Sequence, residues 1–279
     1  MKKYNKAPLP FQGQKRNYLK IFNRELQKLC GDGTGWTIVD VFGGSGLLSH
    51  NAKYTCPEAR VIYNDFDNYT ERLLKINKTE RLRQNLWELI RVRGKDKDTQ
   101  LAQDTKIRVI ELLKNSEYID YITLSSYLLF AGNYVHSIDE LETRQFYNRV
   151  SKSPINADGY LNGVETVHKC FTELMKDEFD GNVLYLLDPP YINTQQGYHR
   201  DKNNYFGLLS QLALFELMKP IKSPFFYFTS SKSEVSELTT NMDCGELSQL
   251  FSNSNSFSVQ NPVNNVGRYT DILIIKTTY

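Results

Sequence analysis

The sequence predicts an α/β fold in which a second, mainly helical unit interrupts a β-sheet. Two apolar strands, residues 36–42 and 59–64, lie near the N-terminus, and three more, 183–187, 225–229 and 272–275, lie in the second half. Segments with helical spacing separate these strands. Strands that alternate with helices are typical of a sheet covered by helices. The polar, basic stretch between the two groups of strands is therefore expected to be an insertion.

The N-terminal elements follow from local patterns. Apolar residues spaced four and three apart predict a helix over Asn17–Cys30, and Gly31 ends it. The strand over 36–42 ends abruptly at a glycine loop, after which a helix begins at Leu47. The next strand, 59–64, is followed directly by Asp65. A strand, a glycine turn and a helix in this order form the start of a parallel sheet.

The later stretches are less regular. Residues 67–113 are polar, basic and mostly helix-forming, whereas residues 117–164 mix aromatics, Asn and Gly without clear periodicity. A helix is predicted over 165–176, and an amphipathic helix marked by Leu208, Leu212 and Phe215 ends before Pro220. We expect residues 1–68 and 165–279 to form one domain and residues 69–164 to form the insertion.

Composition indicates a folded protein. The chain has 279 residues, of which 40% are hydrophobic, 24% charged and 13% aromatic, and this excludes a disordered or fibrous chain. No apolar run approaches the roughly 18 residues of a membrane-spanning helix, and no apolar segment typical of a signal peptide follows the basic start. We therefore expect a cytoplasmic protein.

The cysteines and histidines indicate no metal site. The four cysteines lie far apart without a C-x-x-C pair, and the four histidines are equally scattered. Separated cysteines are typical of a reduced, cytosolic chain. No metal is expected.

Positive charge gathers in two segments although the net charge is only +2, from 34 basic and 32 acidic residues. Residues 1–24 carry seven basic side chains and no acidic one, and residues 71–114 carry twelve basic and seven acidic ones. This distribution suits a polyanionic partner. Ordinary solvated helix faces explain it equally well, so charge only supports the argument.

The first motif that indicates chemistry is Asp40-Val41-Phe42-Gly43-Gly44-Ser45-Gly46, where a strand runs into a glycine turn. Glycines let the backbone turn tightly and approach a ligand closely. Asp65 lies 22 residues after Gly43, an offset at which a carboxylate binds ribose hydroxyls. The pattern fits a dinucleotide or an adenosyl cofactor, and it leaves an oxidoreductase open.

The second motif is Asp188-Pro189-Pro190-Tyr191, at the carboxyl end of a predicted strand. Open α/β sheets place their chemistry at this edge. The amine of adenine is a poor nucleophile, because its lone pair is delocalised into the ring. The Asp188 carboxylate and the Pro189 carbonyl can each accept one amine N–H, and Pro fixes the backbone that holds this carbonyl. Tyr191 can stack on a base drawn out of the helix.

A third segment, Pro8–Arg16, precedes both motifs. In this order the sequence resembles the DNA adenine-N6 methyltransferases of the Dam type, which carry a W/F-x-G-x-K segment, an F-x-G-x-G loop, an inserted target-recognition domain and D-P-P-Y. The matching residues are Phe11–Lys15, Phe42–Gly46, Asn64-Asp65 and Asp188–Tyr191. The resemblance covers residues 1–68 and 165–279. Gln14 departs from it, because many members have a second glycine there.

The resemblance implies a Rossmann-like seven-stranded S-adenosylmethionine-dependent methyltransferase sheet whose last strands form a reversed hairpin, supplied in part by 225–229 and 272–275. It implies catalytic roles for Asp188, Pro189, Pro190 and Tyr191. S-adenosyl-L-methionine, which leaves as S-adenosyl-L-homocysteine, is expected to contact the following residues: Phe11, Gln12, Lys15, Asp40, Phe42, Gly43, Gly44, Ser45, Gly46, Asp65, Phe66 and Asp188.

The expected partner is double-stranded DNA, bound by residues 69–164 acting as target-recognition domain. Arg91, Arg93 and Lys95 are candidates for phosphate contacts, and Tyr127, Asn133 and Tyr134 are candidates for base contacts. Methylation by a monomer or weak dimer is expected. A cognate restriction endonuclease is a partner in one of three possible roles, beside a solitary chromosomal methylase and a phage enzyme.

The leading hypothesis is methylation of N6 of a flipped-out adenine in double-stranded DNA. The same chemistry on RNA or on cytosine N4 stays open, although Asp188 favours adenine, since related cytosine-N4 enzymes usually carry Ser at this position. Two further hypotheses are a catalytically silent DNA-binding relative and a nucleotide-dependent oxidoreductase. The complete Asp-Pro-Pro-Tyr motif argues against the silent relative, and an oxidoreductase leaves this motif unexplained.

Overall fold

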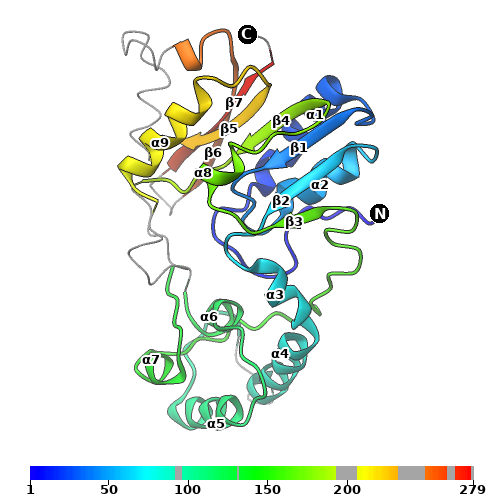
Figure 1. Cartoon of the computed structure of the whole chain (residues 1–279). Helices are drawn as coiled ribbons and strands as arrows, with labels where there is room; N and C mark the ends of the chain where they lie inside the picture. Colours follow the sequence, from blue (N-terminus) through cyan, green and yellow to red (C-terminus); the bar gives the residue numbers. More distant parts are fainter. Residues whose placement is uncertain (92–95, 131, 193–205, 232–248, 263–267, 278–279) are drawn as a thin grey trace.

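The structure, a computed structural model, describes residues 1–91, 96–130, 132–192, 206–231, 249–262 and 268–277. Its upper part in Figure 1 is a sheet with helices on both faces, and its lower part is a group of helices. The two parts are joined by helix α3 on the way out and by residues 155–164 on the way back.

The sheet has seven strands in the order β3-β2-β1-β4-β5-β7-β6. Its strands are β1 (Trp36–Asp40), β2 (Arg60–Asn64), β3 (Glu165–Val167), β4 (Asn182–Leu187), β5 (Phe225–Ser230), β6 (Asn255–Pro262) and β7 (Arg268–Lys276). The first five are parallel, whereas β7 runs antiparallel to both β5 and β6. The expected α/β, Rossmann-like seven-stranded sheet is thus confirmed.

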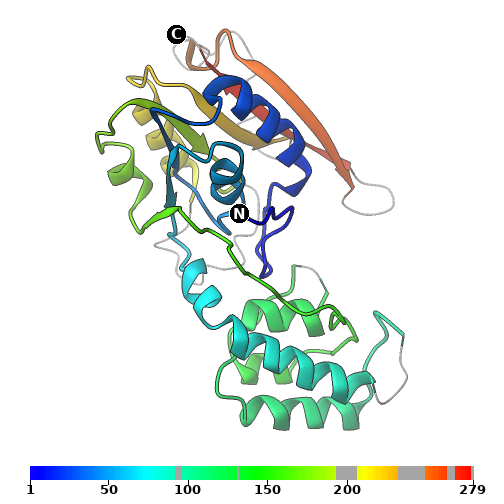
Figure 2. The ribbon, with the colours of Figure 1, turned by 90° about the vertical axis from the view of Figure 1, so that its right-hand side faces the viewer.

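Helices cover both faces, which explains why the central strands are apolar almost throughout. The 3-10 turn η1 (Arg16–Tyr18), α1 (Leu19–Cys30) and α2 (Leu47–Thr55) lie on one face, and α8 (Phe171–Leu174) and α9 (Leu208–Met218) lie on the other (Figure 2). Successive strand residues alternate between two cores. Ile38 packs toward α1 and α2, and Val39 packs toward α8 and α9.

Two sequence-based assignments in the second half need correction. The predicted helix over 165–176 is instead strand β3 followed by the four-residue helix α8, because Glu165–Val167 pair with the edge of β2. The segment 225–229 is the parallel strand β5 and not part of the reversed hairpin. The hairpin consists of β6 and β7, and β7 includes the predicted segment 272–275.

Helix α9 has the predicted position but not the predicted buried stripe. Phe215 and Leu214 are fully buried, whereas Leu208 is 55% exposed and Leu212 is 40% exposed. The sheet therefore contacts a different side of this helix from the side that the leucine spacing indicates.

The helical part has its own core. It contains α3 (Tyr69–Leu74), α4 (Ile76–Arg91), α5 (Gln103–Lys114), α6 (Tyr121–Leu128) and α7 (Ile138–Glu142). Leu86, Val109, Leu128 and Phe146 are among the buried residues at its centre. The short helices α6 and α7, where the sequence shows no periodicity, begin at Asp120 and Ser137, whose side chains accept hydrogen bonds from backbone N–H groups of the first turn.

The chain leaves the sheet after β2 and returns to it at β3. These strands are hydrogen-bonded neighbours, with Ile62 opposite Glu165 and Asn64 opposite Val167. The two ends of the helical part are therefore anchored side by side at one edge of the sheet (Figure 1).

Candidate active site at the carboxyl ends of the parallel strands

Three aspartates follow three neighbouring parallel strands. Asp40 ends β1, Asp65 follows β2 and Asp188 follows β4. Because β1 lies between β2 and β4, and Asp40 is opposite Leu186, the three residues reach the same edge of the sheet. This is the edge where open α/β sheets bind ligands.

Lys15 and Asp188 form a buried ion pair. Lys15 Nζ lies 2.7 Å from Asp188 Oδ1, and the two side chains are 7% and 15% exposed. The same ammonium donates to the carbonyl of Gly13 at 3.0 Å and lies 5.2 Å from the centre of the Tyr191 ring. Burial raises the pKa of Asp188, and the charge of Lys15 acts against this rise. The structure thus brings the N-terminal motif into contact with Asp-Pro-Pro-Tyr.

Residues of β5 and β7 hold the Tyr191 hydroxyl. This hydroxyl donates to the carbonyl of Thr229 at 3.2 Å and lies 3.4 Å from Asp271 Oδ1. Pro189 is buried and Pro190 is half-buried. The rigid dipeptide and the anchored ring therefore fix the backbone next to Asp188.

Asp40 is a buried carboxylate with incomplete hydrogen bonding. It is 0% exposed, and Ser49 Oγ donates to its Oδ2 at 2.5 Å. Within the described part of the chain, Asp40 Oδ1 has no hydrogen-bond partner. Burial raises the pKa of Asp40 to about 7, and the charge of Asp188 adds to the rise. A buried acceptor that lacks a donor is rare in proteins and is a feature of functional sites.

The glycine loop follows Asp40 and is contacted from several sides. A Cβ on Gly43 would lie 2.2 Å from the Tyr63 ring, so this position requires glycine. The carbonyl of Gly44 accepts from Tyr63 Oη at 2.7 Å, and that of Ser45 accepts from Tyr160 Oη at 2.8 Å. Phe11 packs on Gly44. Gly46 precedes α2 in a left-handed conformation with φ 71°.

The neighbour of this loop, Phe42, points away from it into a core. Its ring lies 5.4 Å from that of Phe171 and 5.6 Å from that of Phe206. Phe42 therefore supports the loop through packing.

Asp65 does not present a free carboxylate, contrary to the ribose role expected for it. Oδ1 accepts from Tyr63 Oη at 2.9 Å and from the Tyr69 N–H at 2.6 Å. Oδ2 accepts from the N–H of Thr70 at 2.9 Å and from the Thr70 hydroxyl. A carboxylate has about four acceptor positions, so this one is saturated. Asp65 therefore holds the start of α3 and has no acceptor position left for ribose hydroxyls in this structure.

Phe66 lies beside a residue that the sequence did not indicate. The Phe66 ring is 38% exposed and stacks on His168, with ring centres 5.6 Å apart and an angle of 13°. His168 Nδ1 lies 2.8 Å from the carbonyl oxygen of Asp65. No motif marks His168, which follows β3, a segment that the sequence pattern predicts to be helical.

The remaining predicted site residues are dispersed. Gln12 is exposed beside Phe11, and Arg91 is exposed at the end of α4. Arg93 and Lys95 lie outside the described residues. Asn133 is exposed and Tyr134 is half-buried in the segment after α6.

The expectation that Tyr127 contacts bases is wrong. This residue is only 8% exposed and belongs to the core of the helical part. Its place on the inner face of α6 removes it from the candidate base contacts.

Phe130 is an exposed aromatic residue that no sequence motif indicates. It is 44% exposed, in the same segment as Asn133. The Tyr147 ring lies 4.3 Å away and the Arg149 guanidinium 5.1 Å away. Two neighbours thus hold an apolar ring at the surface.

The described residues hold neither a membrane-spanning helix nor a cluster of metal ligands. No helix in these ranges is both long and apolar enough to cross a membrane. No group of three or more His, Cys, Asp or Glu side chains there is arranged to hold a metal ion.

Comparison with known proteins places the chain in a family. The model of the family described as D12 class N6 adenine-specific DNA methyltransferase matches residues 11–262. A Haemophilus influenzae protein described as "Putative methyltransferase" is 40% identical over 281 aligned positions, which cover 99% of this chain and 93% of the relative.

Among solved structures, a protein of Pyrococcus horikoshii described as a "putative RNA methyltransferase" matches with a TM-score of 0.43 and 11% identity, covering 98% of this chain and 90% of the other. The family match spans the N-terminal motif, the glycine loop and Asp-Pro-Pro-Tyr. The chain belongs to the D12 class N6 adenine-specific DNA methyltransferase family.

Proposed function

We propose that the protein transfers a methyl group from S-adenosylmethionine to N6 of an adenine that has been flipped out of double-stranded DNA. The observation that carries this proposal is the buried Lys15–Asp188 pair in front of the rigid Pro189-Pro190 backbone, beside a second buried carboxylate, Asp40. A methyltransferase of this family uses S-adenosylmethionine, and the residues present fit that cofactor.

The fit depends first on Asp40. Its Oδ1 lacks a donor among the described residues, and a primary ammonium such as that of the methionine part of the cofactor supplies one. Beside it lies the glycine loop Gly43–Gly46, on which Phe11 packs, and Lys15 reaches Asp188 at the same edge of the sheet. The exposed Phe66 ring on His168 offers an apolar surface for a purine.

The cofactor supplies an electrophilic methyl group, so that a carbon–nitrogen bond to N6 forms as the carbon–sulfur bond breaks and N6 then loses a proton. The protein positions the amine. Asp188 and the Pro189 carbonyl accept the two N–H bonds of N6, and the geometry directs the nitrogen lone pair. Lys15 favours the ionised, accepting form of Asp188 against the effect of burial.

DNA recognition is assigned to residues 69–164. Tyr191 stacks on the flipped base, since its hydroxyl is anchored at Thr229 and its ring borders Asp188. Arg91 is proposed for phosphate contact, and Asn133, Tyr134 and the exposed Phe130 for contacts with bases or base steps. Methylation of RNA, methylation of cytosine N4 and a silent relative are the competing hypotheses.

The test is transfer of a labelled methyl group from S-adenosylmethionine to unmethylated duplex DNA, followed by analysis of the nucleosides. N6-methyladenine is expected. In Asp188→Ala the rate is expected to fall by at least about 100-fold, because a positioned acceptor for the amine is lost. Asp177→Ala is the control, since Asp177 also pairs with a lysine, Lys169, at 2.7 Å, but its side chain is 34% exposed.

Each other outcome contradicts a stated part of the proposal. Label in N4-methylcytosine would overturn the target base, and label only in RNA would overturn the polymer. Full activity of Asp188→Ala would overturn the role of this carboxylate. Binding of S-adenosylhomocysteine without transfer to any nucleic acid would indicate a silent relative.

A further inference from the structure

The N-terminal segment connects the helical part to the active site. The backbone of Leu9 forms two hydrogen bonds with the hydroxyl of Tyr69 in α3, one through its N–H at 2.9 Å and one through its carbonyl at 3.0 Å. Two residues later Phe11 packs on the glycine loop, and Lys15 reaches Asp188. The N-terminal segment therefore contacts α3, the glycine loop and Asp188.

Arg72 is the centre of this connection. Its Nη2 donates to the carbonyl of Pro10 at 3.0 Å. The same guanidinium pairs with Asp120, at 3.1 Å from Nε and 3.0 Å from Nη2 to Oδ2. The two side chains are 11% and 3% exposed, so this pair is largely shielded from water and salt.

Asp120 carries the connection into the helical part. It is the first residue before α6, where its carboxylate accepts from the Thr123 N–H at 3.3 Å and from the Thr123 hydroxyl at 2.8 Å. Helix α6 leads directly to the segment with Phe130 and Asn133. Arg72 thus joins the candidate DNA-binding segment to Pro10, next to Phe11.

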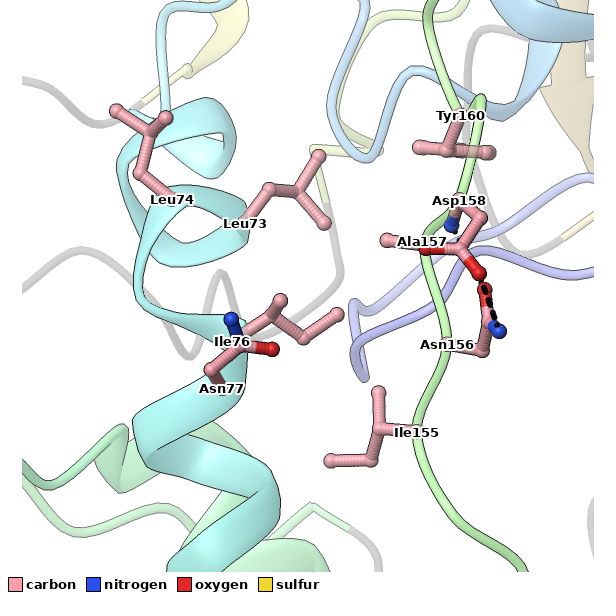
Figure 3. Close-up of a pocket in the computed structure, with 9 residues that line it drawn as sticks. All are labelled: Leu73, Leu74, Ile76, Asn77, Ile155, Asn156, Ala157, Asp158 and Tyr160. Atoms are coloured by element: carbon pink, nitrogen blue, oxygen red, sulfur yellow. Dashed lines mark hydrogen bonds between the residues drawn. The ribbon is translucent and has the colours of Figure 1, made fainter.

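An apolar cluster that includes Leu9, Tyr69 and Tyr160 joins the two connections but does not fill the space between them. A cavity of about 440 Å³ lies between the α3–α4 side and the returning segment 155–160. Figure 3 shows Leu73 and Ile76 facing Ile155 and Ala157 across this space. A cavity at this place removes some of the dispersion contacts between the α3–α4 side and the returning segment.

We propose that Arg72 is a positioning residue that couples binding of DNA by the helical part to binding of the cofactor. It acts through Pro10 on Phe11 and Lys15 and touches neither ligand. Coupling of this kind is reciprocal, so DNA that orders α6 raises affinity for the cofactor by the same factor by which the cofactor raises affinity for DNA. The inference rests on the proposed function, since it assigns DNA to residues 69–164.

The test measures the dissociation constant of S-adenosylhomocysteine by calorimetry, with and without an excess of short fragments of unmethylated plasmid DNA. Arg72→Met alone would leave Asp120 buried without its partner charge, which destabilises a protein strongly. The working variant is therefore Arg72→Met with Asp120→Asn, because Asn keeps the cap of α6 and the pair is removed as a unit. Circular dichroism confirms that it is folded.

The matched control is Arg83→Met with Glu80→Gln. Arg83 is also a buried arginine, paired with Glu80 at 2.7 Å and donating to a backbone carbonyl, that of Ser151, at 2.7 Å. These contacts, with those to Lys152 and Ile155, lie within residues 80–155 and do not include the N-terminal segment that carries Pro10, Phe11 and Lys15. If loss of any buried ion pair disturbed cofactor binding through general destabilisation, both double variants would show it. A loss of coupling between DNA and cofactor is expected only in the Arg72 variant.

In the wild type DNA is expected to lower the dissociation constant at least about fivefold, the lower end of usual coupling. The Arg72 variant is expected to show less than about a twofold change, and the control is expected to match the wild type. A wild type that methylates DNA but shows no coupling, or an Arg72 variant that keeps it, overturns this inference alone. A wild type that neither binds nor methylates DNA overturns the proposed function, and this inference with it.

Discussion

The helical part and the edge of the sheet bury charged side chains in opposite ways. In the helical part, Arg83 meets the Glu80 carboxylate and the Ser151 carbonyl, and Glu80 also accepts from the Ile155 N–H at 2.9 Å. At the edge of the sheet, Lys15 pairs with Asp188, and the nearby Asp40 keeps one oxygen without a donor among the described residues.

The difference in hydrogen bonding distinguishes charged groups with a structural role from charged groups that can bind a ligand. Buried groups whose hydrogen bonds are complete gain nothing from a ligand, whereas an incompletely bonded carboxylate raises the free energy of the folded state until a donor arrives. The completed hydrogen bonding around Arg83 is therefore typical of a structural role, whereas the incomplete hydrogen bonding of Asp40 is a feature of functional sites.

The largest expected effect is a loss of stability in the helical part. Arg83→Met leaves the Glu80 carboxylate, which is only 16% exposed, without its partner charge. The free energy of unfolding is expected to fall by about 3 kcal/mol, measured by urea denaturation. Adding Glu80→Gln is expected to recover most of the loss. If Arg83→Met alone were as stable as the wild type, the Arg83–Glu80 pair would not have the structural role stated above.

A smaller loss, of function rather than stability, is expected at the edge of the sheet. Lys15→Met removes the charge that opposes the rise in the pKa of Asp188, so this pKa is expected to rise further. At neutral pH methyl transfer is expected to fall by about 100-fold, and its acid limb is expected to move to higher pH. A pH–rate profile measures both effects.

The control for this variant is Lys219→Met. Lys219 pairs with Glu216 at 2.7 Å just after α9 and is distant from Asp188 in the sequence and in its contacts. Its profile is expected to match that of the wild type. An unshifted acid limb in Lys15→Met would mean that Lys15 does not control the ionisation of Asp188.

The smallest expected effect is a change at Asp40 that depends on pH. Its pKa is raised to about 7 in the folded protein, mainly by burial. The folded state therefore holds a proton that the unfolded chain has lost above about pH 4, and the stability from this proton disappears as the pH rises through 7. Asp40→Asn is expected to gain roughly 1 kcal/mol or more relative to the wild type between about pH 5 and pH 8, by urea denaturation.

The same substitution sharpens the assignment of the cofactor. Ionised Asp40 attracts an ammonium, so affinity of the wild type for S-adenosylhomocysteine is expected to rise with pH around 7, and that of Asp40→Asn is expected to be weaker and nearly constant. Calorimetry at several pH values measures this. A pH-dependent affinity that survives in the variant would assign the titration to another group.

The sequence predicts best where burial on both faces makes a strand apolar. The strand before Asp40 and the strand before Asp188 are of this kind, so their ends and the edge they share could be located from the pattern. Strand β3 could not, because it has only three residues, and its pairing with β2 brings together residues about a hundred positions apart. Helix α7 does carry a local signal in the sequence, Ser137 followed three residues later by Glu140, which is typical of a helix start.

Site residues divide along the same line. Asp188 and Lys15 were indicated by their motifs, and the structure brings them together. The saturation of Asp65 was unreadable, because it depends on a left-handed turn at Asn68 that directs the next two N–H groups back to the carboxylate. Arg72 carries no motif, since its importance comes only from the three segments that meet at its guanidinium.

The adjacent ends of the helical part have an evolutionary consequence. Asn64 and Glu165 lie on neighbouring strands, and Glu165 is opposite Ile62, two residues before Asn64. The chain between them therefore closes a loop whose two ends are held by strand pairing. The entropy of closing such a loop grows only slowly with its length, by about 0.6 kcal/mol for each doubling. Exchange of this segment for one of another size would leave the strand pairing intact, so evolution could replace it without altering the edge of the sheet that carries the three aspartates.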